Sequence, residues 1–377
     1  MTFILNSDNA FDYLRTQGLL DKYQQPPTKI EPLAAKNFNL LLTFTEKHKL
    51  LIKQERLNKK GVAAGEFIIE WRIQEFLRRF PELQKYRQFL AEVLHFDVEN
   101  SIIVCRYLDD YRDLTDFYGK EKSFPTEIAI AIGNILATIH RDTFEHPEYQ
   151  EFFTQDSVNF HLVSNLIRGF ERVEPEIFGL VTDDALKFFA LYQRYDSLGQ
   201  AIAQLGESVK PACLTHNDLK LNNILVRNNW QDSDHIIRLI DWERSHWGDP
   251  AFDLGTIIGS YIQIWLGSLV ISTSLTIEES LRLAITPLEM VQPSIAALTQ
   301  SYLNTFPEII QHRPDYLHRV VQFAGLALIL HIESMIQYEK SFSNTGIAML
   351  QVAKALLTRP VQSIPTIFGH TFNITAV

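Results

Sequence analysis

Two short segments of the chain gather polar side chains of the kinds that bind a metal and move a proton. The segment at 214–225, LTHNDLKLNNIL, carries His216, Asp218 and Asn223. The segment at 236–255 carries Asp241 directly after an apolar run. A carboxylate beside an amide oxygen is an all-oxygen donor pair, which suits Mg²⁺ completed by water and phosphate oxygens. Asp218, a loop's width away, is able to accept a proton from an incoming hydroxyl.

A predicted β-hairpin positions these groups. Residues 224–227 and 236–240 are strand-like and apolar, and residues 228–235 form a polar turn between them. Tight pairing of the two strands brings Asn223 and Asp241 to the same open end. The hairpin is therefore expected to build the metal site.

The N-terminal part of the chain is predicted to be rich in strands. Residues 40–44 and 50–52 read as a hairpin, residues 65–80 as a helix stopped by Pro81, and residues 101–108 as a further strand. The charged cluster at 109–113 is the best candidate for a boundary. We therefore assign residues 1–106 to an N-terminal lobe made of a small antiparallel sheet with one helix.

The remainder, residues 107–377, is predicted to be a larger and mainly helical lobe. Ile128, Ile132, Ile135 and Ile139 fall on one face of an amphipathic helix. Residues 254–277 contain no charged residue, and a buried core helix followed by a loop explains this better than a membrane span, because glycine, glutamine, serine and threonine interrupt the stretch. The predicted fold class is α+β.

Composition limits the classes of function. The chain has 377 residues, 46% of them hydrophobic, and a formal net charge of −10, which excludes a nucleic-acid binder that relies on a dense basic surface. Its two cysteines fit a reducing compartment. The N-terminus lacks the basic start and apolar core of a secretion signal. We expect a cytoplasmic protein that binds neither nucleic acid nor membrane, and the sequence leaves its oligomeric state open.

The motifs together resemble the aminoglycoside phosphotransferase and choline kinase-like family, within the protein-kinase-like superfamily. The resemblance follows the family's order over most of residues 29–255 and implies a bilobal protein-kinase-like fold. The matching pieces are LATIH at 136–140, H-x-D-x-x-x-x-N at 216–223, IDWE at 240–243 and GDPAFDL at 248–254.

The resemblance implies a role for each residue of the catalytic loop. Asp218 is the expected catalytic base, and Asn223 and Asp241 are expected to hold one or two Mg²⁺ ions. His216 is expected to support the loop's structure, and Asp253, near the end of the GDPAFDL motif, to tie the following helix to the backbone of the catalytic loop. Lys220 matches a lysine of protein kinases and is expected to offset charge on the transferring phosphoryl group.

The resemblance also implies a nucleotide site in the N-terminal lobe. Lys53 lies on the strand where the family keeps the lysine that binds the α- and β-phosphates, and Glu70 aligns best as its partner, ahead of Glu66 and Glu75. The expected adenine hinge comprises Val104, Cys105 and Tyr107. One departure from kinases is that the phosphate loop lacks glycine, since its turn is LAAKNF at 33–38.

The predicted function is transfer of the γ-phosphoryl group of ATP, with Mg²⁺, to a hydroxyl of a small molecule such as an amino sugar or amino alcohol. GTP is not excluded as the donor. The substrate is expected between the helices after residue 140 and those near residues 315–340. The alternatives are a protein-directed kinase, which Lys220 favours, and a noncatalytic nucleotide-binding scaffold, which the glycine-free loop favours. Glu243 is either a supporting residue or a substrate contact.

Overall fold

The chain forms two compact units, which are described separately. The computed structural model describes residues 3–21, 23–58, 61–154, 182–270, 272, 274–369 and 372. Unit 1 comprises Met1–Asp113 and Asn223–Ser245, and unit 2 comprises Leu114–Asn222 and His246–Val377. The second predicted hairpin therefore joins the N-terminal unit. The lobe boundary between residues 106 and 107 stays a prediction.

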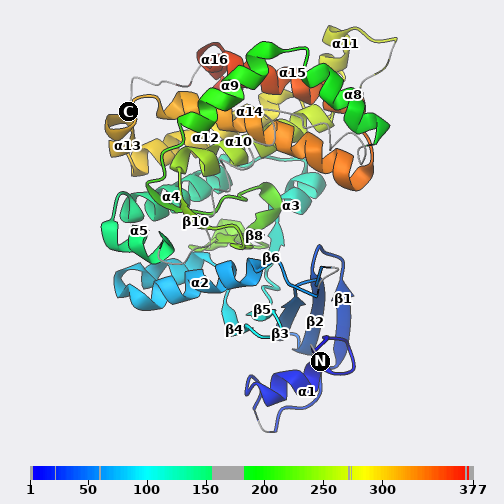
Figure 1. Cartoon of the computed structure of the whole chain (residues 1–377), viewed down its shortest axis with the longest axis vertical. Helices are drawn as coiled ribbons and strands as arrows, with labels where there is room; N and C mark the ends of the chain where they lie inside the picture. The colour runs from blue at the N-terminus through cyan, green and yellow to red at the C-terminus, as the bar shows by residue number, and fades with distance from the viewer. Residues whose placement is uncertain are drawn as a thin grey trace. The chain divides into compact units, whose positions relative to one another are not determined.

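Unit 1 is built on a five-stranded antiparallel sheet with the order β1-β2-β3-β5-β4 (Figure 1). The predicted hairpin at 40–52 is confirmed, because Leu40 pairs with Ile52 and Leu42 with Leu50. The strands are β1 (Lys29–Leu33), β2 (Phe38–Thr45), β3 (His48–Gln54), β4 (Val93–Asp97) and β5 (Ile102–Arg106).

Helices cover both faces of this sheet. On one face Leu14 of α1 (Ala10–Thr16) packs in a buried cluster with Leu42 and Ile52. On the other face Phe67 of α2 (Glu66–Arg79) packs with Ile103 and Cys105. The predicted helix at 65–80 is confirmed: it begins after a glycine with φ of +83° and ends just before the proline that opens η1 (Pro81–Phe89). Alternation of buried side chains between the two faces is what a two-sided sheet requires.

A second, three-stranded sheet completes unit 1. Its strands are β6 (Tyr111–Asp113), β8 (Ile224–Arg227) and β9 (Ile237–Leu239), in the order β6-β8-β9, with η3 (Trp230–Asp232) in the turn. Strand β6 was missed in the sequence, where its charges indicated only a boundary. Arg112 pairs with Val226, and a charged edge strand is a common device because an edge faces water on one side.

Unit 2 is mainly helical, as predicted, and packs its longest helices against one another. The predicted amphipathic helix is α4, in which Ile128, Ile132 and Ile139 are buried and Ile135 is partly buried. The helices are α3 (Leu114–Glu121), α4 (Thr126–Thr143), α5 (Pro147–Thr154), α8 (Asp183–Tyr192), α9 (Asp196–Glu207), α10 (Pro250–Gly267), α11 (Ile277–Arg282), α12 (Leu288–Thr305), α13 (Glu308–His312), α14 (Tyr316–Ser334), η4 (Met335–Glu339), α15 (Asn344–Thr358) and α16 (Pro360–Phe368). A two-stranded sheet pairs β7 (Cys213–Thr215) with β10 (His246–Gly248), and η2 (Leu221–Asn223) precedes β8.

The helix predicted in the charge-free stretch after residue 253 is α10, and it lies in the core of unit 2. Its first thirteen residues, Pro250–Ile262, are all buried. Asp249 caps its N-terminus by accepting a hydrogen bond from the backbone of Ala251 at 3.1 Å, and it also pairs with buried Arg319. Asp249 therefore has the structural role expected for a residue before a proline.

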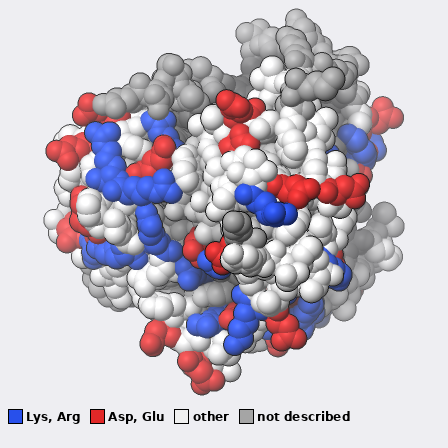
Figure 2. Space-filling model, turned by 90° about the horizontal axis from the view of Figure 1, so that it is seen from below, with Lys and Arg blue, Asp and Glu red and all other residues white. Residues whose placement is uncertain are grey.

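The polarity of the surface is mixed. On the face in Figure 2, lysine and arginine side chains lie close to aspartate and glutamate side chains. By length and composition, the described residues include one helix apolar enough to cross a membrane, Tyr316–Glu339, and 61% of its apolar window is buried.

Candidate active site

The predicted hairpin brings Asn223 and Asp241 to one end of the small sheet in unit 1. Ile224 pairs with Leu239, and the backbone N–H of Ile240 donates to the carbonyl oxygen of Asn223 at 3.0 Å. Asp241 follows directly, with a φ of +67° that turns the chain out of the strand. The two residues predicted to hold Mg²⁺ thus lie at neighbouring positions, at the same end of the paired strands.

Lys53 of β3 lies between two carboxylates of unit 1. Its Nζ atom is 3.8 Å from Glu70 Oε2 and 3.5 Å from Asp241 Oδ1. Of the three candidate glutamates, Glu70 is the one that contacts Lys53, whereas Glu66 pairs with Lys36 and Glu75 accepts a hydrogen bond from Trp71 at 3.2 Å. Strand β3, helix α2 and the end of the second hairpin therefore converge on one ammonium group.

Burial makes this group of charges electrostatically tight. Burial alone would lower the pKa of Lys53, but the negative charges of Glu70 and Asp241 outweigh it and raise that pKa above its usual value. Burial also raises the pKa of Glu70, and the negative charge of Asp241 adds to the increase while Lys53 opposes it. Lys53 is therefore held as a cation at neutral pH.

A second charged group in unit 1 was not assigned from the sequence. The Nζ atom of Lys36, in the turn between β1 and β2, contacts Glu66 at the start of α2 and lies 3.7 Å from Glu243 Oε1. Glu243 is 7% exposed, and burial, with the neighbouring charges of Asp241 and Glu66, raises its pKa to about 8. In the sequence, the position of Glu243 two residues after Asp241 was the one sign that it lies near the predicted metal site. Spacing along the chain could not predict its contact with Lys36.

The donors in unit 1 fit a magnesium ion. Among the described residues, no group of three or more histidine, cysteine, aspartate or glutamate side chains could hold a metal by itself. Mg²⁺ in phosphoryl-transfer sites uses one or two carboxylates, with phosphate oxygens and water as the remaining ligands. Asn223 and Asp241 supply an amide and a carboxylate oxygen of that kind.

The predicted catalytic loop lies in unit 2, where a buried carboxylate fixes its backbone. Asp253 of α10 accepts hydrogen bonds from the backbone N–H groups of His216 at 2.7 Å and Asn217 at 2.8 Å. The ring of His140 joins Asp253 to the Tyr302 hydroxyl, with distances of 3.3 Å and 2.8 Å. Asn217 has a φ of +61°, so these bonds hold a turn that an isolated chain would rarely adopt.

Asp218 and Lys220 form an ion pair on this loop. Lys220 Nζ is 3.1 Å from Asp218 Oδ2, and their side chains are 48% and 16% exposed. The backbone N–H of Asp218 donates to Nδ1 of His216 at 3.3 Å, and His216 is fully buried. The predicted base is thus positioned by its loop, beside the predicted lysine.

The predicted hinge residues lie at the end of β5. Val104 and Cys105 are buried and paired on both sides, with β3 and with β4. Tyr107 follows the strand, is 36% exposed, and donates its backbone N–H to the carbonyl oxygen of Lys49 at 3.1 Å. Their contact with adenine stays a prediction.

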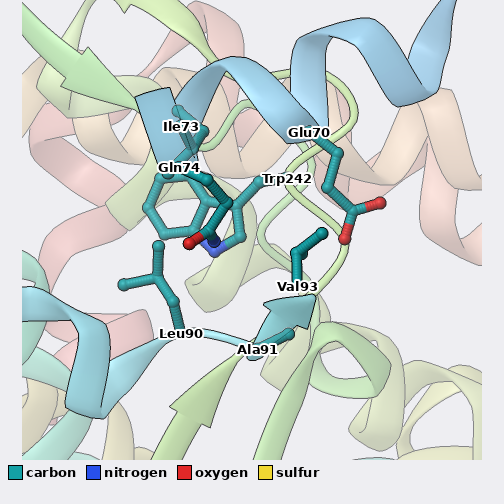
Figure 3. A pocket seen from close by; sticks show the side chains of 7 residues that line it. All are labelled: Glu70, Ile73, Gln74, Leu90, Ala91, Val93 and Trp242. Carbon is teal, nitrogen blue, oxygen red and sulfur yellow. The ribbon is translucent and has the colours of Figure 1, made fainter. Parts of the chain in front are cut away.

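A small pocket lies beneath α2 (Figure 3). Its empty space of about 180 Å³ includes open solvent, so it is a narrow opening rather than an enclosed cavity. Trp242 lines it and anchors the segment after β9 by donating from its ring nitrogen to the carbonyl oxygen of Leu239 at 3.2 Å. The other lining residues are Glu70, Ile73, Gln74, Leu90, Ala91 and Val93. We therefore read this pocket as part of the packing that holds Glu70 and Trp242.

Residues 155–181 and part of the predicted substrate region with them lie outside the described residues. The other side of that predicted region is α14 and η4. Burial lowers the pKa of His331 on α14, and the positive charge of Lys220 lowers it further against the opposing charge of Glu339. His331 is therefore a polar group of α14 within electrostatic range of Lys220 in the predicted catalytic loop.

Comparisons with solved structures identify the fold. The choline/ethanolamine kinase family protein from Mesorhizobium loti superposes with a TM-score of 0.51 and 16% identity, over 96% of this chain and 99% of that one. The choline kinase from Cryptosporidium parvum Iowa II gives 0.51 and 13%, over 98% and 100%. A streptomycin–ATP ternary complex of the aminoglycoside enzyme APH(2")-IIa gives 0.51 and 16%, over 94% and 99%. The predicted bilobal, protein-kinase-like α+β fold is confirmed.

Comparisons of sequence identify the family. Protein LicA from Haemophilus influenzae is 26% identical over 182 residues, which are 48% of this chain and 57% of that protein. The chain thus spans about half the length of the curated relatives it matches. The model of the phosphotransferase enzyme family matches residues 72–276, and this range includes both predicted metal ligands and the catalytic loop. With more than half of its residues matched, the chain belongs to the phosphotransferase enzyme family.

Proposed function

We propose that the protein is an ATP- and Mg²⁺-dependent phosphotransferase that moves the γ-phosphoryl group to a hydroxyl of a small molecule. The observation that carries the proposal is the contact of Lys53 with both Glu70 and Asp241. A buried ammonium between two carboxylates is a suitable arrangement for a triphosphate and its metal. An ion pair between Lys53 and Glu70 that served only stability would not need the second carboxylate, Asp241, at the end of the hairpin.

In this proposal the residues of unit 1 bind the nucleotide and its metal. Lys53 binds the phosphates, and Glu70 keeps its ammonium in place. Asn223 and Asp241 hold the metal. Bound Mg²⁺ supplies charge neutralisation and orientation of the phosphate oxygens. Val104, Cys105 and Tyr107 form the adenine hinge in this proposal, and GTP stays open as a second donor.

In this proposal the residues of unit 2 orient and activate the acceptor. Asp218 orients the acceptor hydroxyl and takes its proton as the oxygen attacks the γ-phosphorus, while the bond from that phosphorus to the β,γ-bridging oxygen breaks and ADP leaves. Lys220, whose ammonium contacts Asp218, offsets negative charge on the phosphoryl group. Asp253 and His216 keep the loop rigid, which matters because phosphoryl transfer depends mainly on positioning and charge stabilisation.

An amino alcohol or an amino sugar is the proposed acceptor. Two similar structures are named for choline or ethanolamine kinases, and the third contains streptomycin with ATP. These names support the class of acceptor, and the panel below tests it. With 45 acidic residues against 35 basic ones, we propose no nucleic-acid partner and no membrane partner.

Protein-directed kinase activity has less support. Helix α10 begins at Pro250, so little chain separates it from Asp241. An activation segment of the kind that protein kinases carry does not fit in this interval. Lys220 is the feature that still favours such an activity.

The test is ATP consumption across a panel of amino alcohols, amino sugars and other polyhydroxy metabolites, with wild type, Asp218→Ala and Asp241→Asn. We expect turnover with at least one small alcohol and its loss in both variants. Turnover with a protein substrate, together with no turnover on any member of the panel, would contradict the proposed acceptor. Mg·ATP binding without turnover on any acceptor would establish the scaffold instead.

A further inference from the structure

The turn between β1 and β2 lies where kinases keep glycines over the phosphates, and here it carries a lysine. Leu33 pairs with Asn39, and Asn39 pairs in turn with Lys53. Residues 34–37 therefore extend from the same end of the sheet as the lysine that contacts Glu70 and Asp241. Lys36 lies within this turn, in the same unit as the predicted metal ligands.

The contacts of Lys36 join the turn to two glutamates, Glu66 and Glu243. Its ammonium contacts Glu66 and lies 3.7 Å from Glu243 Oε1. Glu243 is nearly buried and follows Asp241 by two residues, whereas the Lys36 side chain is 53% exposed. The Lys36 side chain is half-exposed, whereas the side chains of Glu66 and Glu243 are 18% and 8% exposed, so its ammonium is the member of this group that a ligand in solution can reach.

A lysine solves a chemical problem that the missing glycines create. Glycine-rich loops bind phosphates through backbone N–H groups, and this needs a backbone that can approach closely. Ala34 and Ala35 carry Cβ atoms at the corresponding positions. A lysine side chain supplies positive charge at longer reach, as a point charge for phosphate oxygens.

We propose that Lys36 is a phosphate-binding residue of the nucleotide site, and that it exchanges Glu66 for the phosphates of Mg·ATP. Glu66 and Glu243 hold the ammonium near the site before the nucleotide arrives. This inference rests on the proposed function, because it assumes that Mg·ATP binds beside Lys53. It adds a residue that compensates for the glycine-free loop.

The experiment measures binding of Mg·ATP and of adenosine by titration calorimetry, which requires no acceptor. In Lys36→Ala the affinity for Mg·ATP is expected to fall by about tenfold, because a charge-assisted contact is lost, while the affinity for adenosine stays unchanged. The control is Lys29→Ala, which removes an exposed lysine of β1 that pairs with Glu31; its affinities should equal those of wild type. Equal binding of Mg·ATP by wild type and Lys36→Ala would overturn the proposal.

A second variant tests the exchange itself. Glu66→Gln removes the competing carboxylate, so it is expected to tighten Mg·ATP binding in wild type but not in the Lys36→Ala background. Unchanged affinity of Glu66→Gln would contradict the exchange. If wild type failed to bind Mg·ATP at all, the proposed function would fail with this inference; if wild type and Lys36→Ala bound it equally well, this inference alone would fail.

Discussion

Lys53 Nζ lies 3.5 Å from Asp241 Oδ1, although 188 positions separate the two residues in the chain. The contact forms within one compact unit, because the hairpin 224–239 belongs to the same unit as the N-terminal sheet. It joins the predicted phosphate lysine to a predicted metal ligand. This relationship is the structural basis of the proposed nucleotide site.

Removing the charge of Lys53 tests that relationship. Lys53→Met keeps the length of the side chain but leaves the Glu70 and Asp241 carboxylates without their shared cation. Phosphoryl transfer is expected to fall by about a hundredfold or more, as for other preorganised charges at a reacting phosphate. ATP turnover and Mg·ATP affinity measure the effect. Lys47→Met, in the exposed turn between β2 and β3, is the control, and equal losses in both variants would contradict the assignment.

Asp253 is expected to contribute acid-sensitive stability to unit 2. Burial alone would raise its pKa, but the hydrogen bond and charge of His140, together with His216, lower that pKa below the ordinary value. A carboxyl with a lowered pKa in the folded state stabilises fully above its unfolded pKa, about 4, and loses this contribution as the pH falls through the folded value.

The Asp253→Asn variant tests this contribution. An amide offers one acceptor oxygen for two backbone donors, so the free energy of unfolding at neutral pH is expected to fall by about 1–3 kcal/mol. The variant should also depend less on pH below about pH 4. Urea unfolding at several pH values measures both, and an acid dependence identical to that of wild type would show that Asp253 is not the group responsible.

Replacing two glycines of unit 2 by alanine is expected to change the free energy of unfolding in opposite directions. A methyl group on Gly255 of α10 would lie 2.5 Å from Phe323 Cβ and 2.7 Å from the carbonyl oxygen of Val320, both on α14. Gly255→Ala is therefore expected to lower the free energy of unfolding by about 1–3 kcal/mol through overpacking. A methyl group on Gly199 of α9 meets nothing within 4 Å, so Gly199→Ala is expected to gain about 0.5–1 kcal/mol. Thermal unfolding compares the two, and the same sign in both would contradict the packing of α10 on α14.

The two cysteines are expected to be unreactive in the folded chain. Burial, with the charges of Glu70 and Asp241, raises the pKa of Cys105 to about 12, and burial raises the pKa of Cys213 well above its usual value. Thiolate is the reactive form, so a disulfide reagent at mildly alkaline pH should modify neither thiol. After denaturation both thiols should react. Rapid modification of one thiol in the native chain would show that its surroundings open.

The sequence predicted the elements whose information is local. The apolar runs of β2 and β3, the helix ended by Pro81, and the hairpin that carries Asn223 and Asp241 follow from short-range pattern and turn chemistry. The expectation that Lys53 pairs with Glu70 came from the resemblance to kinases, and the structure places the two side chains 3.8 Å apart.

What the sequence did not predict depends on contacts between distant segments. Strand β6 has a charged sequence and forms only because β8 offers a partner. The contacts of Lys36 with Glu66 and Glu243 depend on where the turn, the start of α2 and the end of the hairpin meet. Charged side chains carry no periodic signal that names their partner, so such pairs become visible only in the fold.

In the proposed reaction Asp218 acts as the base toward a hydroxyl acceptor while unit 1 binds the nucleotide. The most direct measurement is single-turnover phosphoryl transfer to an acceptor identified by the panel, in wild type and Asp218→Asn, with Mg·ATP binding measured on the same samples. We expect Asp218→Asn to bind Mg·ATP as wild type does but to transfer the phosphoryl group more slowly, by about a hundredfold or more. Transfer at the wild-type rate in Asp218→Asn would contradict it.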